Sequence, residues 1–269
     1  MQTYRRLSNL LVVTLAVVLL FTVAQAGFSQ SRSGLQEILE RGTLRVGTTG
    51  DFNPFSFRDP RTGEYSGHDI ELVTKLAEDM GVEVEFVATD WRNLVSGVAA
   101  GKYDITTGAS YNMGRARTAG YTLPVLEVGT VPVVHSRNAD RFRSWDDVDQ
   151  RGVTVAVTLG TVFDDQAKEL LENARIVRVE PPARDYQEVL SGRADVSLTS
   201  TFEASSLAEQ YRQLQIARVD APEFRNAIGI LVAQGDQTLI NYINVWITMQ
   251  EHNGYLDELR AKWLPELSF

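Results

Sequence analysis

Residues 44–72 read LRVGTTGDFNPFSFRDPRTGEYSGHDIEL, and this stretch decides the fold. A short apolar run ends in small polar residues, and the phenylalanines Phe52 and Phe55 flank a proline. The segment Asp59-Pro60-Arg61-Thr62-Gly63 is typical of a turn. Apolar residues at helical spacing follow from Ile70 to Met80. The predicted order is therefore strand, loop, hairpin and helix, with the loop at the end of a strand.

Helical and extended segments then alternate along the chain. In the first half, helices are predicted at 35–41, 70–80 and 91–100, and strands at 44–48, 82–87 and 104–107. In the second half, strands are predicted at 131–135, 153–157, 176–179, 195–199 and 228–232, and helices at 161–172, 185–191, 201–210, 237–251 and 255–262. This alternation is typical of α/β proteins with a mostly parallel sheet.

The pattern restarts near residue 131, which predicts two α/β lobes joined by a hinge of two strands. We expect residues 27–128 and 227–269 to form the first lobe, and residues 129–226 to form the second lobe with the hinge crossings. A cleft between such lobes lies at the carboxyl ends of strands and the amino ends of helices, where ligands bind in open α/β sheets. Free N–H groups at helix N-termini favour an anion there.

The N-terminus is predicted to be an export signal rather than part of the fold. Arg5 and Arg6 precede an apolar run of about 14 residues, and Ala24-Gln25-Ala26 offers small residues to a signal peptidase. The run is short for a membrane span, which needs roughly 20 residues. We expect a signal peptide over residues 1–26, cleavage after Ala26 and a periplasmic protein. An uncleaved N-terminal anchor is the alternative.

Composition excludes several classes of site. The chain has 269 residues, no cysteine and a net charge of −9. Disulfides, thiolate metal sites, a cysteine nucleophile and a lipid-anchored cysteine are therefore excluded, and the charge disfavours nucleic acid as a partner. The three histidines, His68, His135 and His252, show no metal-ligand spacing. We expect no metal and no cofactor.

Three segments in combination resemble a known family. They are the stretch quoted above, ATDWRNL at 88–94 and GASYNMGRARTAGYT at 108–122. Over about residues 35–264 the chain is similar to the periplasmic solute-binding proteins that feed polar amino acid ABC transporters. The resemblance implies a type II periplasmic binding protein fold and a monomer. Such a protein closes on a small carboxylate-bearing ligand and delivers it to an ABC permease.

The resemblance also implies ligand-binding residues. Phe52 and Trp91 match two aromatic residues that enclose the ligand side chain, although both could instead be ordinary core aromatics, as we expect for Phe55 and Phe57. Arg115 matches the arginine that pairs with the ligand carboxylate, because a guanidinium fork can donate two parallel hydrogen bonds to it. The alternative for Arg115 is a surface arginine that neutralises nearby acids.

Further residues would complete the carboxylate site. The Gly108 carbonyl and the Ser110 hydroxyl would line the same loop as the arginine. Thr161 matches the residue whose N–H and hydroxyl contact the carboxylate, and it could also be a plain helix N-cap.

The chain departs from the family's pattern at Ser200, where amino-acid binders have an aspartate that neutralises the ligand's α-ammonium group. A hydroxyl cannot offset a buried cation. Either the ligand lacks an α-ammonium group, or another acid supplies the charge. Glu203 and Asp51 are the candidates for that acid.

Glu203 also supports an enzyme hypothesis. The chain looks especially like the cyclohexadienyl dehydratases, in which a glutamate at this position would protonate a leaving hydroxyl. That branch carries an asparagine where this chain has Val162, and an aspartate where it has Ser200. We therefore expect a binding protein rather than an enzyme, with a prephenate or arogenate dehydratase as the alternative. A ligand sensor with a separate membrane partner is a third class. Glu203 could also be a first-turn glutamate favoured by the helix dipole.

Overall fold

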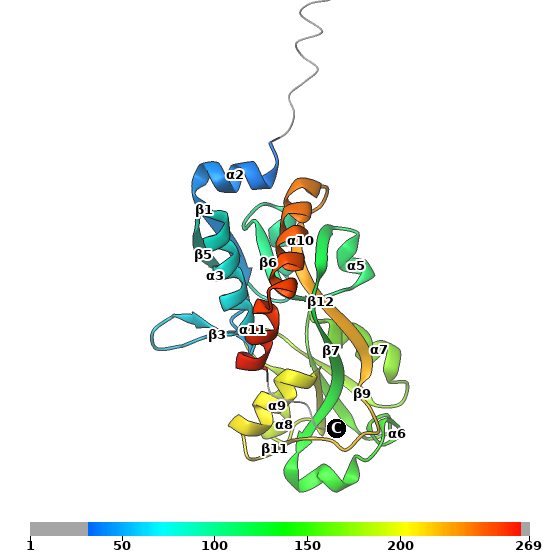
Figure 1. Cartoon of the computed structure of the whole chain (residues 1–269). Helices are drawn as coiled ribbons and strands as arrows, with labels where there is room; N and C mark the ends of the chain where they lie inside the picture. Colours follow the sequence, from blue (N-terminus) through cyan, green and yellow to red (C-terminus); the bar gives the residue numbers. More distant parts are fainter. Residues whose placement is uncertain (1–31, 265–269) are drawn as a thin grey trace, which may run out of the picture. The chain divides into compact units, whose positions relative to one another are not determined.

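The computed structural model describes residues 32–264, so the predicted export signal over residues 1–26 lies outside the described residues. The chain from Gly34 onward forms one compact unit (Figure 1). Among the helices of the described part, none combines the length and the apolar character that crossing a bilayer needs.

The strands and helices follow the predicted alternation. The strands are β1 (Thr43–Thr48), β2 (Asp51–Phe52), β3 (Ser56–Arg58), β4 (Tyr65–Ser66), β5 (Glu83–Ala88), β6 (Ile105–Ser110), β7 (Ala119–His135), β8 (Thr154–Thr158), β9 (Arg175–Val179), β10 (Val196–Ser200), β11 (Leu214–Ile216) and β12 (Glu223–Ala233). The helices are α2 (Gly34–Arg41), α3 (His68–Met80), α4 (Leu94–Ala99), α5 (Met113–Ala116), η1 (Ser136–Arg141), α6 (Trp145–Val148), α7 (Val162–Leu170), α8 (Asp185–Leu190), α9 (Thr201–Gln210), α10 (Gln237–His252) and α11 (Tyr255–Trp263).

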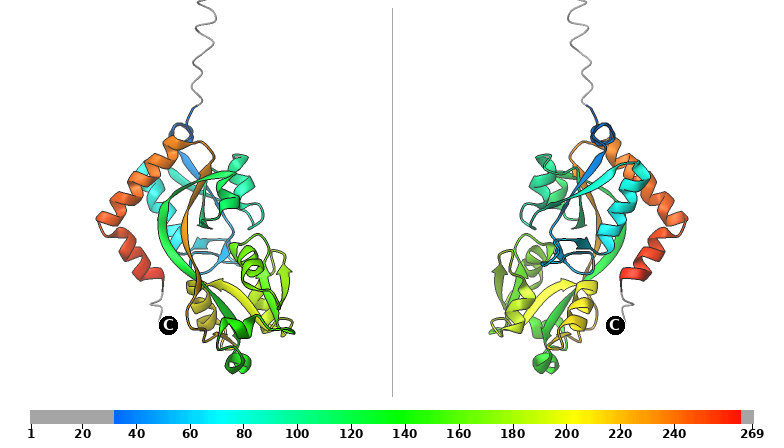
Figure 2. Two further views of the ribbon diagram at one scale, coloured as in Figure 1. Left: turned by 90° about the vertical axis from the view of Figure 1, so that its right-hand side faces the viewer. Right: turned by 90° about the vertical axis from the view of Figure 1, so that its left-hand side faces the viewer.

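One mixed sheet runs through both lobes in the order β5-β1-β6-β12-β7-β10-β8-β9. At one end β1 pairs in parallel with β5 and β6, and at the other end β8 pairs in parallel with β9 and β10. Between them β7 and β12 pair antiparallel, side by side in Figure 1. We call the part built on β5, β1 and β6 the first lobe and the part built on β10, β8 and β9 the second lobe. In both views of Figure 2, α10 and α11 lie along the outer side of the first lobe.

Separate hydrophobic cores support the two lobes. One core packs residues between Ile38 and Val128 against residues of β12, α10 and α11. Two smaller cores use residues from Val131 to Ala217. The strand β7 contributes residues to all three cores and so connects the packing of the two lobes. The predicted residue limits of the lobes stay a prediction.

The hinge strands are tied to α7 by a buried ring of hydrogen bonds. The Thr130 hydroxyl on β7 donates to Oε1 of Gln166 at 2.7 Å, and the Gln166 amide donates to Oδ1 of Asn226 on β12 at 2.9 Å. The Asn226 amide closes the ring by donating to the Thr130 hydroxyl at 3.3 Å. Because buried polar groups are stable only when paired, this ring fixes α7 against both crossing strands.

Three expectations were wrong in detail. The helix expected at 91–100 begins only at Leu94, because Asp90 accepts a hydrogen bond from the Asn93 amide at 3.0 Å and forms a turn instead. The strand expected at 131–135 is the end of the 17-residue β7, whose earlier part contains a proline and two glycines. Phe57 is not in the core and is 40% exposed, since the short strand β3 turns it outward.

Candidate functional site

A buried arginine, Arg184, lies where the two lobes meet and has partners in both of them. It immediately precedes α8, at the carboxyl side of β9, and its side chain is 6% exposed. The Nη2 group donates to Oε1 of Glu203 at 2.8 Å. The Nε group donates to the Thr158 hydroxyl at 3.2 Å and lies 3.6 Å from Oδ1 of Asp185. The guanidinium therefore contacts three elements of the second lobe.

The same guanidinium reaches across to the first lobe. Its Nη1 group lies 3.4 Å from Oδ2 of Asp51 and also donates to the backbone carbonyl of Asp51. Asp51 in turn accepts a hydrogen bond from the indole N–H of Trp91 at 3.0 Å. Arg184 thus joins carboxylates of both lobes through one cation.

Three carboxylates share this single guanidinium, and the pKa values of Glu203, Asp185 and Arg184 are shifted. Burial raises the pKa of Glu203 to about 7, although Arg184 opposes the rise. Burial also raises the pKa of Asp185. The pKa of Arg184 is raised despite its burial, because Glu203, Asp51 and Asp185 all favour its charged form.

Glu203 is held from both sides. One carboxylate oxygen accepts from Arg184, and the other accepts from the Thr199 hydroxyl. Glu203 lies in the first turn of α9, as the alternative interpretation had it, and its side chain is buried, with 2% exposed. Ser200, which stands where an ammonium partner was expected, is the N-cap of α9 and accepts from the Glu203 amide at 3.1 Å. Ser200 therefore orients the helix turn that carries Glu203.

Arg115 comes from the short helix α5 of the first lobe and has neutral partners. Its Nη1 group donates to the Ser110 carbonyl at 3.3 Å, and its Nη2 group donates across the cleft to the Gly160 carbonyl at 3.2 Å. Within residues 32–264, no carboxylate lies within salt-bridge distance of Arg115, unlike Arg184. The interpretation of a surface arginine neutralising acids is therefore not supported.

The aromatic residues lie together on the first lobe. Phe52 and Trp91 are buried and contact each other edge to face, with ring centroids 5.4 Å apart. This contact leaves no gap between the rings, so enclosing a ligand group between them would require the rings to separate. Gly108 lies beside both, because a Cβ placed there would be 3.6 Å from the Phe52 ring and 4.0 Å from the Trp91 ring.

Thr161 lies at the start of α7, as predicted, but its polar groups are used locally. Its hydroxyl donates to the Thr158 carbonyl at 2.7 Å, and its amide donates to the same carbonyl at 3.2 Å. Thr161 is the N-cap residue of α7, as the alternative predicted, although its side chain makes no capping hydrogen bond. The neighbouring Gly160 has φ +88° and lies against the backbone of Trp91 and Arg92 of the first lobe.

The predicted residues thus fall into two connected groups. Phe52, Trp91 and Gly108 join the Arg184 cluster through Asp51, whereas Arg115 links the Ser110 carbonyl to the carbonyl of Gly160, the residue before Thr161. Sequence reasoning missed Arg184. The signal was available, since Arg184 precedes a helix after a strand, as Thr161 and Ser200 do.

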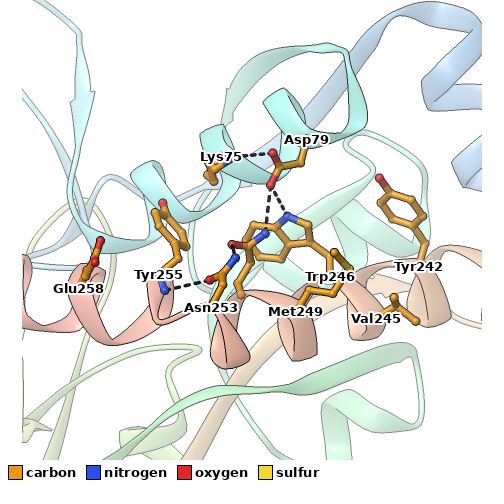
Figure 3. A pocket seen from close by; sticks show the side chains of 10 residues that line it. Lys75, Asp79, Tyr242, Val245, Trp246, Met249, Asn253, Tyr255 and Glu258 are labelled. Carbon is orange, nitrogen blue, oxygen red and sulfur yellow. Dashed lines mark hydrogen bonds and ion pairs between the residues drawn. The ribbon is translucent and has the colours of Figure 1, made fainter.

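A separate pocket of about 670 Å³ lies between α3, α10 and α11 of the first lobe (Figure 3). The Asp79 carboxylate in its wall pairs with Lys75 and accepts from the Trp246 indole at 2.8 Å and the Gln250 amide at 3.2 Å. Asp79 is thus satisfied within the wall, and the pocket does not touch the second lobe. We therefore place the candidate site in the cleft.

The residues from 32 to 264 contain no cluster of three or more His, Asp or Glu suited to a metal, and the absence of a metal stays a prediction.

The family model of the bacterial extracellular solute-binding proteins, family 3, matches residues 44–266. The chain belongs to this family. The cyclohexadienyl dehydratase of Pseudomonas aeruginosa is 32% identical over 250 residues, which are 93% of this chain and 92% of that protein. The crystal structure of an ancestral amino acid-binding protein, described as a precursor of cyclohexadienyl dehydratase, has a TM-score of 0.80 and 38% identity over 87% of this chain and 100% of that chain.

An ancestral cyclohexadienyl dehydratase has 41% identity and a TM-score of 0.53 over 87% of this chain and 97% of that chain. Binding proteins and enzymes therefore both occur among the relatives of this solute-binding protein. The predicted family and the two-lobed α/β fold are confirmed.

The contact of Gly160 with the first lobe predicts that Gly160→Ala opens this solute-binding protein. A Cβ at Gly160 would lie 2.8 Å from the Arg92 amide nitrogen. Gly152 is the matched control, because it has φ +87° and a Cβ added there would have nothing within 4 Å. Both alanine variants should lose about 1–2 kcal/mol of folding stability through the positive φ. Only Gly160→Ala should raise the radius of gyration in small-angle X-ray scattering, and identical scattering of the two variants would contradict the contact.

Glu203 predicts a dependence of stability on pH. Its pKa is about 7 when folded and near the ordinary 4.5 when unfolded, so the folded state holds a proton between these values that the unfolded chain releases. The free energy of unfolding should therefore fall as pH rises through this window. Urea titrations at several pH values give the free energy of unfolding of the unmodified protein and of Glu203→Gln. We expect the unmodified value minus the variant value to decrease from about pH 5 to about pH 8. Glu209→Gln, on the exposed side of α9, controls for loss of a charge. A flat or rising difference would show that burial does not dominate at Glu203.

Proposed function

We propose that this protein is an exported solute-binding protein that captures a small carboxylate-bearing ligand between its lobes and delivers it to an ABC permease. The observation that carries the proposal is Arg115, a cation on the cleft wall whose partners are two backbone carbonyls. A carboxylate would accept two parallel hydrogen bonds from this guanidinium, which are stronger than its bonds to carbonyls.

Hinge closure supplies the mechanism. The lobes share the long strands β7 and β12, and the contacts of Arg115 and Arg184 each cross the cleft. A ligand that touches both lobes binds the closed arrangement better and shifts the population toward it. Membership of an extracellular solute-binding family supports export, as does the predicted signal over residues 1–26. The permease, the cleavage after Ala26 and the monomeric state are part of the proposal.

Arg115→Ala should abolish ligand binding while the fold is retained. Removing one half of a desolvated charge pair costs roughly 2–5 kcal/mol of binding free energy. The measurement is a thermal-shift screen of the mature protein against carboxylates and amino acids, followed by calorimetry on any ligand found. Arg117→Ala is the control, because Arg117 is an exposed arginine two residues away. Near-normal affinity in Arg115→Ala would refute the assignment.

A second function, cyclohexadienyl dehydratase activity, is favoured by Glu203. A buried carboxyl with a pKa of about 7 can give its proton to a leaving hydroxyl at neutral pH. The hydroxyl would leave as water, the ring carboxylate would leave as carbon dioxide, and the electron pair of the broken carbon–carbon bond would complete the aromatic ring. Two features rank this function second. Both Glu203 oxygens are already bound, and Val162 places an apolar side chain at the start of α7.

Prephenate should persist at its spontaneous rate when incubated with the protein, and phenylpyruvate should not accumulate above background. The expectation follows because Arg184 and Thr199 already engage Glu203, and Ser200 supplies no carboxylate. The absorbance of phenylpyruvate measures the outcome, with Glu203→Gln as the paired sample. Turnover that disappears in Glu203→Gln would put the dehydratase first, because an amide cannot donate the proton.

A further inference from the structure

The guanidinium of Arg184 lies at the centre of a cluster of acids. Around it lie carboxylates of Asp51, Asp185 and Glu203, at 3.4, 3.6 and 2.8 Å from its nitrogens. These acids come from a loop strand of the first lobe and two helix starts of the second lobe. Such a cage of acids from opposing walls is suited to an amine or guanidinium group of a small molecule.

The charge balance shows that the acids need a cation. Ionised carboxylates in a buried site are costly unless they are paired, and the cost of leaving one unpaired exceeds that of a surface charge. In the described chain Arg184 is the cation that contacts all three acids, and its side chain is 6% exposed. Because the charged tip of Arg184 satisfies these acids from within, no ligand cation is needed there.

We infer that Arg184 is a selectivity residue, an internal cation that fills the amine-binding part of the cleft and restricts the site to carboxylates without a cationic group. The inference rests on the proposed function, because it concerns which carboxylates the cleft admits. Arg115 stays available for the anion, since its partners are carbonyls, whereas Arg184 is committed to protein acids. Amino acids with cationic side chains would have to displace Arg184 into solvent or meet it at close range, and both are unfavourable.

Chemical rescue tests the inference directly. Arg184→Ala removes the side chain beyond Cβ, and N-ethylguanidinium carries the missing atoms. We expect N-ethylguanidinium to bind Arg184→Ala at least tenfold more tightly than the unmodified protein, measured by thermal shift and calorimetry against equal concentrations of potassium chloride. L-Arginine should show the same preference for the variant. Arg184→Lys keeps a cation among the three acids, so it should not bind N-ethylguanidinium more tightly than the unmodified protein does.

Arg178→Ala is the matched control outside the cleft. Arg178 pairs with the buried carboxylate of Asp164 on α7, and its own side chain is 42% exposed. This variant should gain no N-ethylguanidinium binding beyond that of the unmodified protein. An equal gain in Arg178→Ala, or no gain in Arg184→Ala, would overturn the inference.

Two further points cover a variant that does not fold and a failure of the carboxylate screen. If Arg184→Ala does not fold alone, the titration measures the folded fraction by circular dichroism, and a failure of N-ethylguanidinium to restore it counts against the inference. N-ethylguanidinium has no carboxylate, so its result does not depend on Arg115. A failed carboxylate screen of the unmodified protein would therefore refute the proposed function, whereas a failed rescue would refute the role of Arg184.

Discussion

One buried guanidinium, that of Arg184, holds acids from both lobes, and the geometry of the cleft depends on it. Taking a cation and three carboxylates out of water is unfavourable unless each finds a partner. That requirement places the start of α8, the start of α9 and the loop strand β2 within a few ångströms of one point. The aromatic wall follows, because Asp51 also binds the indole of Trp91.

The two arginines of the cleft divide the electrostatics between them. Arg184 is surrounded by acids and neutralised within the protein, whereas Arg115 is held by carbonyls and is the cation that the proposed function assigns to a ligand carboxylate. The same division bears on the alternative function as a dehydratase. Glu203 has the burial that a general acid needs, but its oxygens are bound by Arg184 and Thr199. A role as general acid would therefore require Glu203 to exchange these partners for a substrate hydroxyl.

Local patterns predicted most of the fold because they reflect local physics. Helical periodicity placed α3, α9 and α10 nearly to the residue, and Gly81 marked the end of α3. The length of β7 was missed, since its pairing with β12 overrides the proline and glycines in its sequence. At the site, the resemblance gave Arg115 and Glu203, but not Arg184. Its place between a strand and a helix start marked Arg184 as a candidate site residue, but two of the acids around it are distant in sequence, so its pairing with them appears only after folding.

The burial of the Arg184 cluster has a consequence for ionic strength. Mobile ions screen charges that solvent reaches, with a Debye length of about 8 Å at physiological salt, and they act weakly on charges from which water is excluded. Pairs on the surface, such as Arg193 with Glu188, are open to this screening because Arg193 is 64% exposed. The contact of Arg184 with Glu203 is not open to this screening. The ion pair of Arg184 with Glu203, whose side chains are 6% and 2% exposed, is therefore insulated from the salt concentration of its surroundings.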